Sequence, residues 1–262
     1  NIKIARESTA VNREEHKILW DVGEGQKGGY DHFMLKEIHE QPRVIRDTLV
    51  EYTSSAEPVV DLERMRDEGI ESMLILACGT SYHAALVGKY IVEELVGIPV
   101  RVEIASEFSY YGQTLARTLA IVITQSGETA DTLKAIKRLR GVGCRVVAIT
   151  NVVGSSASRI ADQTIYTTAG PEIRGAATKS FSAQLMVLYW VAMGYSKANA
   201  SRLASMLLGL RQLPSKVQRV LDNGDIILRC ARYLSKCENV FFIGRGINFP
   251  VALEGALKLK EI

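Results

Sequence analysis

The fold is decided by Leu119-Ala120-Ile121-Val122-Ile123-Thr124-Gln125-Ser126-Gly127-Glu128-Thr129-Ala130-Asp131, in which an apolar strand runs into a polar turn and then a helix. The turn carries the hydroxyls of Thr124, Ser126 and Thr129 and the amide of Gln125. A helix N-terminus leaves backbone N–H groups unpaired and carries partial positive charge, so this turn suits an anion, and its hydroxyls suit a phosphate monoester. Ser126 and Thr129 could instead be plain helix caps, and the turn alone leaves both interpretations open.

A second turn of the same kind follows an earlier apolar strand. Residues 73–77 are typical of a buried strand, and they lead into Cys78-Gly79-Thr80-Ser81-Tyr82 and a helix predicted from His83. In parallel sheets, ligands bind where the carboxyl ends of adjacent strands meet. Thr80 and Ser81 are therefore predicted to face the same ligand as the first turn.

Between residues 72 and 195 the sequence alternates strands and helices. Strands are predicted near 73–77, 100–104, 119–123, 145–150 and 163–167, and helices at 83–96, 128–140, 155–161 and 178–195. Alternation of this kind predicts an α/β fold, a three-layer α-β-α sandwich with a parallel five-stranded sheet. Further helices are expected at 31–54 (bent or restarted near Pro42), 59–68, 198–221 and 223–236.

A second copy of the same strand-turn-helix unit is predicted near the end of the chain. Asn239–Ile243 is apolar and precedes Gly244-Arg245-Gly246 and a helix, as in residues 73–83. One strand and one helix cannot bury their own faces, so this copy is expected to be truncated. The predicted units are a linker or the tail of a missing domain at 1–29, a first subdomain with flanking helices at 30–222, and the start of a second subdomain at 223–262.

Composition argues against several classes of protein. The 262 residues carry a net charge of +3, from 32 basic and 29 acidic residues, which gives no argument for nucleic-acid binding. The apolar run Leu185–Met193 is far shorter than the roughly 20 residues that cross a membrane, and the polar first residues predict no signal peptide. The four cysteines and four histidines are scattered, so we expect no metal site and a reduced, cytoplasmic protein, and no organic cofactor is implied.

Several motifs resemble one family. ACGTS at 77–81 and QSGETADT at 125–132 resemble the sugar isomerase (SIS) domain of the glutamine:fructose-6-phosphate amidotransferases, also called glucosamine-6-phosphate synthases. Ala252–Ile262 and Tyr30–Pro42 are similar to the same family, and the latter is the narrower signal, because it joins the isomerase half to a glutaminase half that other SIS proteins lack. The resemblance covers nearly the whole chain and implies fructose 6-phosphate and glucosamine 6-phosphate as ligands, a preceding glutaminase domain and a homodimer.

The resemblance also implies a set of site residues. It assigns sugar-phosphate binding to Thr80, Ser81, Thr124, Gln125, Ser126 and Thr129, with a backbone contact at Gly175. The family pattern EIGVASTK reads EIRGAATK at 172–179 here, which leaves the substrate preference open.

The last predicted helix carries the candidate catalytic residues. Glu254, Lys258 and Glu261 are spaced four and three apart, so they share one helical face, as a simple solvated ion pair also would. Isomerisation needs a base that moves a proton between adjacent carbons, and the resemblance makes Glu261 that base with Lys258 beside it.

Two alternatives remain at this point. The chain could be another SIS phosphosugar isomerase or deglycase, or a regulatory SIS domain that senses a phosphosugar without chemistry. The family also uses a cysteine in its glutaminase half and a histidine and a lysine downstream of Ile262, so residues 1–262 alone are expected to make no glucosamine 6-phosphate.

Overall fold

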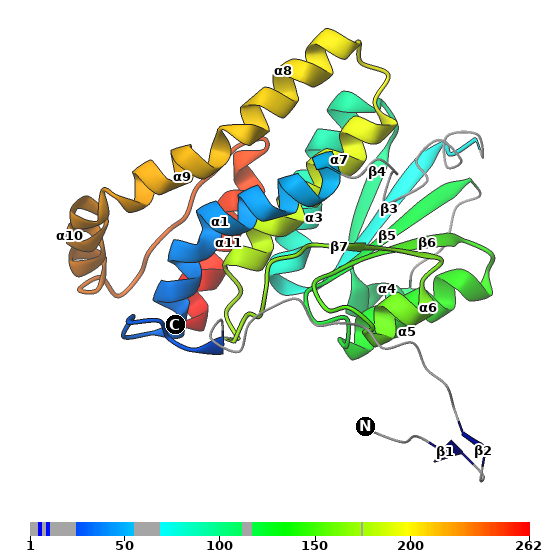
Figure 1. Ribbon diagram of the computed structural model, residues 1–262, viewed down its shortest axis with the longest axis horizontal. Coiled ribbons are helices and arrows are strands. Elements are labelled where there is room, and N and C mark those ends of the chain that lie inside the picture. Colours follow the sequence, from blue (N-terminus) through cyan, green and yellow to red (C-terminus); the bar gives the residue numbers. More distant parts are fainter. Residues whose placement is uncertain (1–4, 7–8, 11–24, 55–68, 112–116, 174) are drawn as a thin grey trace.

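A computed structural model describes residues 5–6, 9–10, 25–54, 69–111, 117–173 and 175–262, drawn in Figure 1. The expected helix at 59–68 lies outside these residues. Near the N-terminus, β1 (Ala5–Arg6) and β2 (Thr9–Ala10) form a two-stranded antiparallel ribbon. In the described part of the chain, no helix is long and apolar enough to cross a membrane.

The central sheet has five parallel strands, as the sequence predicts. They are β3 (Ser72–Ala77), β4 (Val100–Ile104), β5 (Thr118–Thr124), β6 (Arg145–Thr150) and β7 (Gln163–Tyr166), in the order β4-β3-β5-β6-β7. The chain leaves β3 toward one edge of the sheet and leaves β5 toward the other. The strand order therefore reverses between these two neighbours, and the crevice outside their carboxyl ends is where ligands bind in open α/β sheets.

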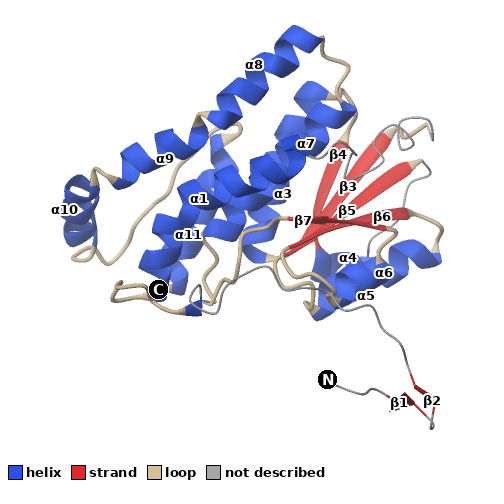
Figure 2. Cartoon of the chain, in the orientation of Figure 1, coloured by secondary structure: helices blue, strands red, loops and turns tan. Residues whose placement is uncertain are grey.

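Helices cover both faces of the sheet, which confirms the predicted three-layer sandwich (Figure 2). One face packs α3 (Gly79–Leu95) and α7 (Lys179–Tyr195) through inward residues such as Ile75 and Ile121. The opposite face packs α4 (Ala105–Tyr111), α5 (Ala130–Gly141) and α6 (Ser156–Ile160) through Leu76, Val122 and their neighbours. Because both faces of the inner strands β3, β5 and β6 are buried, these strands carry long apolar runs, whereas the edge strands β4 and β7 include polar residues.

An outer group of helices covers α7. Helix α1 (Phe33–Ser54) is a single helix with Pro42 inside it, so it does not restart there. Helices α8 (Ala200–Arg211) and α9 (Leu213–Leu221) replace the single stretch expected at 198–221. They pack against α1 and α7 through Ile45, Leu49, Met186, Met193 and Leu210.

The predicted strand at 239–243 is wrong. This segment is extended chain between α10 (Gly224–Leu234) and α11 (Asn248–Glu261), and its Phe241 and Ile243 are 90% and 93% exposed. A strand needs a neighbour to pair its backbone, and none lies beside this segment among the residues the structure describes. The helix that follows was predicted correctly, and α11 packs against α3.

Candidate functional site

The turn after β5 lies at the carboxyl edge of the sheet and is held by its own hydroxyls. Thr124 Oγ1 lies 3.1 Å from Thr129 Oγ1 and accepts a hydrogen bond from the Gly127 N–H at 3.3 Å. Ser126 Oγ accepts from the Glu128 N–H at 3.1 Å. Helix α5 begins at Ala130 rather than at 128, and its N-cap Thr129 makes no side-chain capping bond. Capping of α5 therefore does not account for these hydroxyls.

Glycine is required in the middle of this turn. Gly127 has φ +69°, in the left-handed region, and a Cβ there would lie 2.2 Å from Ser155 Oγ and 2.9 Å from Thr150 Oγ1. The Gly127 carbonyl accepts from the Ala157 N–H at 2.9 Å, and Glu128 Oε1 accepts from the Ser156 N–H at 2.7 Å. The hydrogen bond from the Ser156 backbone lowers the pKa of the Glu128 carboxyl. Glu128 therefore caps the first residue of α6.

The turn after β3 places its two hydroxyls in different roles. Helix α3 begins at Gly79, four residues before the predicted start, so Thr80 and Ser81 lie in its first turn. Thr80 Oγ1 donates to Glu254 Oε1 at 2.9 Å and accepts from Lys258 Nζ at 3.0 Å. Ser81 Oγ accepts from Gln184 Nε2 at 2.9 Å. A hydroxyl has one proton, and that of Thr80 is committed to Glu254, whereas that of Ser81 has no acceptor among the described residues.

Glu254 joins α11 to the first turns of α3. Its Oε2 lies 2.7 Å from Nδ1 of His83, and its Oε1 contacts Lys258 Nζ at 3.5 Å. A carboxylate only accepts, so Nδ1 of His83 carries a hydrogen in this pair. Sequence reasoning placed Glu254 on the polar face of α11 but selected neither it nor His83 as a site residue. The two positions lie 171 residues apart, and only the spacing of Glu254 to Lys258 pointed to a role.

The two candidate catalytic residues contact each other at the end of α11. Lys258 Nζ donates to Glu261 Oε2 at 2.5 Å, and the same ammonium contacts Thr80. The side chain of Lys258 is 17% exposed and that of Glu261 is 35% exposed. The structure thus brings a cation and an accessible carboxylate beside the turn that follows β3, an arrangement able to move a proton on a bound ligand.

Gln125 and Gly175 are the remaining predicted site residues. Gln125 is half-buried, and its carbonyl accepts from the Asn151 N–H at 3.0 Å. Gly175 is exposed in the segment before α7, and among the described residues none lies within 4 Å of where its Cβ would be. No group of three or more His, Cys, Asp or Glu side chains suited to a metal ion was found in the described ranges.

Comparison with known proteins gives consistent matches. A profile of the SIS domain matches residues 68–194. The chain is 46% identical over 261 residues to the glutamine–fructose-6-phosphate aminotransferase [isomerizing] of Caldanaerobacter subterraneus, which covers 96% of this chain and 43% of that protein. It is 48% identical over 259 residues to the protein of the same name from Methanothermobacter thermautotrophicus, and this match covers 98% of this chain and 42% of that protein. The chain therefore spans less than half the length of these curated relatives.

A solved structure extends the match to three dimensions. The C-terminal domain of glucosamine-fructose-6-phosphate aminotransferase from Francisella tularensis superposes with a TM-score of 0.86 at 36% identity, over 90% of this chain and 69% of that one. The sequence match covers 96% of the chain and the structural match covers 90% of it. The chain belongs to the glutamine–fructose-6-phosphate aminotransferase family and contains its SIS domain.

Proposed function

We propose that this chain is the phosphosugar-binding isomerase portion of an enzyme that makes glucosamine 6-phosphate from fructose 6-phosphate and glutamine. The observation that carries the proposal is the 3.0 Å hydrogen bond from Lys258 Nζ to Thr80 Oγ1. It places the Lys258–Glu261 pair beside a turn that, with its neighbour after β5, borders the point where the strand order reverses. A proton-moving pair beside an anion-binding crevice is what a phosphosugar isomerase needs.

The phosphate is proposed to bind between the two turns. The proposed ligands are Thr80, Ser81, Thr124, Gln125, Ser126 and Thr129, with a backbone contact at Gly175. Ser81 is the strongest of these, because Gln184 leaves its proton available. Thr80 contributes mainly through the position it gives to Lys258 and Glu254.

Glu261 is the proposed general base. Its carboxylate takes a proton from one carbon of the open-chain sugar and returns it to the adjacent carbon. A second proton passes from the oxygen on the first carbon to the heteroatom on the adjacent carbon, and the two transfers together convert a ketose skeleton into an aldose skeleton. Lys258 holds this carboxylate at 2.5 Å and provides positive charge near the sugar oxygen on which negative charge develops.

The whole-protein role is proposed from the relatives. They are named for glutamine as well as fructose 6-phosphate, and this chain covers only 43% of one of them. We infer a glutaminase domain joined through residues 1–29, a second subdomain that begins within 223–262, a homodimer and a cytoplasmic location. The alternative functions are those of an isomerase or deglycase without a glutaminase domain and of a phosphosugar sensor. The tests below can also point to either of these.

Serine substitutions test the binding site. Ser126→Ala and Ser81→Ala each remove one hydroxyl, and Ser215→Ala is the matched control on an exposed face of α9. A hydrogen bond to a charged group contributes about 1.5–3 kcal/mol, so calorimetric titration with glucosamine 6-phosphate should show binding about ten- to a hundredfold weaker in both site variants. Affinities equal to that of Ser215→Ala would refute the assignment.

A further inference from the structure

Helix α1 forms polar contacts with one distant stretch of chain along most of its length. Its partners are the end of β7, residues 167–173 and 175–178 (the β7–α7 loop) and the first turn of α7. The bonds join Tyr52 OH to the Tyr166 carbonyl, Thr48 Oγ1 to the Thr167 carbonyl (2.7 Å), Glu37 Oε1 to the Ile173 N–H (2.8 Å), Glu40 Oε2 to Lys179 Nζ (2.6 Å) and Gln41 Oε1 to Ser182 Oγ (2.7 Å). Three of these five α1 residues lie in Tyr30–Pro42, the motif that no step of the proposed reaction uses.

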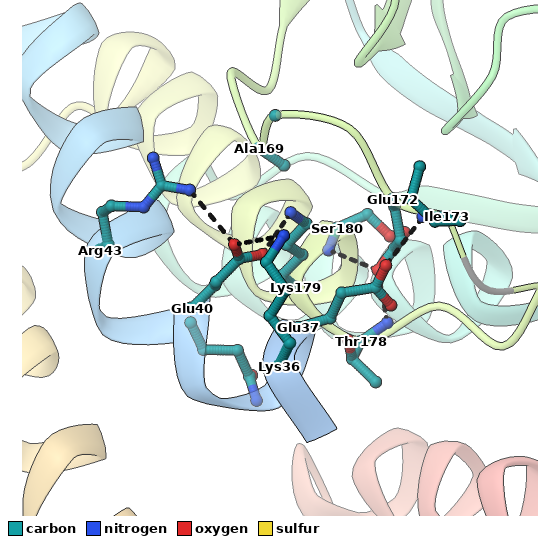
Figure 3. A network of polar contacts seen from close by, with 12 residues as sticks. Lys36, Glu37, Glu40, Arg43, Ala169, Glu172, Ile173, Thr178, Lys179 and Ser180 are labelled. Atoms are coloured by element: carbon teal, nitrogen blue, oxygen red, sulfur yellow. Dashed lines mark hydrogen bonds and ion pairs between the residues drawn. The ribbon is translucent and has the colours of Figure 1, made fainter. Parts of the chain in front are cut away.

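Glu40 is the centre of the charged part of this contact (Figure 3). Lys179 is fully buried and donates to Glu40, and Lys36 and Arg43 contact the other carboxylate oxygen at 3.2 and 3.6 Å. Burial by itself would raise the pKa of Glu40, but the bonds and charges of Lys179 and Lys36 outweigh burial and lower it. A buried ammonium must keep its partner, so this pair fixes the first turn of α7 against α1.

Two further carboxylates bond the β7–α7 loop, one near its middle and one at its end. Glu37 is 1% exposed, and its Oε1 accepts from the Ile173 N–H. Glu172 Oε1 accepts from the Thr178 N–H at 2.7 Å and from the Ser180 N–H at 3.4 Å, so it caps α7. The hydroxyl of Thr178, at the N-cap position, makes no side-chain capping bond. The course of the loop is therefore set by carboxylates, one of which α1 supplies.

The same helix α7 reaches the proposed phosphate site. Gln184 lies five residues after Lys179, is 1% exposed, and donates to Ser81 Oγ. Its Oε1 is buried and has no hydrogen-bond partner among the residues that the structure describes. Because Gln184 lies on α7, the position of α7 determines whether this hydrogen bond to the Ser81 hydroxyl forms. Glu40 in turn fixes the position of α7 through Lys179.

We propose that Glu37 and Glu40 are positioning residues for the sugar site, because they hold the β7–α7 loop and, through Lys179 and Gln184, the hydroxyl of Ser81. This inference rests on the proposed function. Neither carboxylate touches the reacting atoms, so their loss should weaken substrate binding and leave the chemical step nearly intact.

The test compares Glu40→Gln and Glu37→Gln with Glu51→Gln, the same change at an exposed position of α1. Two readouts are made on the full-length protein: KM and kcat for fructose 6-phosphate, and hydrogen exchange of the Ile173, Thr178 and Ser180 amides. For Glu40→Gln we expect KM to rise about tenfold, kcat to change less than about threefold, and exchange of these amides to quicken about tenfold. Glu37→Gln leaves the ion pair between Glu40 and buried Lys179 in place, so it folds even if Glu40→Gln does not, and should show the same changes in smaller measure.

Wild-type KM and wild-type exchange in both variants, or equal effects in Glu51→Gln, would overturn the inference. A fall in kcat with unchanged KM would also overturn it, because positioning of the binding site acts on KM. If the wild-type protein neither binds nor turns over the phosphosugar, the proposed function fails and this inference falls with it. That result is distinct from failure of the inference alone, in which the wild type is active and the variants match it.

Discussion

Replacing Gly127 by alanine should damage the turn after β5 more than an ordinary glycine substitution would. Two costs act together. The φ of +69° is unfavourable for any residue with a Cβ, at about 1 kcal/mol. The new Cβ would also lie 2.2 Å from Ser155 Oγ and 2.4 Å from Ser155 Cβ, and overpacking of this kind costs about 1–3 kcal/mol. The free energy of unfolding should therefore fall by roughly 2–4 kcal/mol.

Gly97→Ala is the matched control. Gly97 has φ +77°, but nothing lies within 4 Å of its Cβ position, so only the backbone cost of about 1 kcal/mol applies. Urea unfolding measures both variants, and each kcal/mol should lower the melting temperature by about 2–4 °C in a chain of this size. Gly127→Ala should also lose affinity for glucosamine 6-phosphate, whereas Gly97→Ala should not. Equal losses of stability in the two variants would refute the steric argument.

Three further predictions follow from individual residues. Glu261→Gln should lower the isomerisation rate about a hundredfold or more with little change in phosphosugar affinity, as measured by turnover and calorimetry; near-normal turnover would exclude it as the base. The exposed Cys230 and Cys237 should react readily with a maleimide, whereas Cys144 should not, because burial raises the pKa of its thiol; mass spectrometry of labelled peptides checks this. The pKa of Glu40 is lower in the folded than in the unfolded protein, so its ionised form stabilises the fold above the unfolded pKa, and this contribution is lost as pH falls through the folded pKa. The difference in unfolding free energy between wild type and Glu40→Gln should therefore stay constant above about pH 6 and shrink in acid. A difference that does not change with pH would contradict the ion pair.

Local sequence patterns were sufficient to predict the five-stranded sheet. The runs at 73–77 and 119–123 are apolar throughout because both faces of their strands are buried, and the hydroxyl-rich turns after them mark the carboxyl edge. The same rule failed at 239–243, which is equally apolar but lies beside no strand in the described part of the chain. An apolar run shows that a segment can be buried, and pairing depends on what lies next to it.

Contacts between distant residues could not be predicted. Glu254 with His83, Gln184 with Ser81 and Glu40 with Lys179 join positions more than a hundred residues apart, and nothing local in the sequence marks them as pairs. Two such contacts give the predicted hydroxyls different roles, because Thr80 donates its proton to Glu254 whereas Ser81 accepts from Gln184. That difference follows only from the packing of α7 and α11 on α3.

We propose above all that the turns after β3 and β5 together bind a phosphosugar through its phosphate. The most direct measurement is calorimetric titration of the protein with glucosamine 6-phosphate, with glucosamine as the control ligand. We expect saturable binding of the phosphorylated sugar, at least about tenfold tighter than that of glucosamine, because the hydroxyls and the helix N-termini act on the anion. Equal affinity for the two sugars, or no binding of either by the full-length protein, would contradict it.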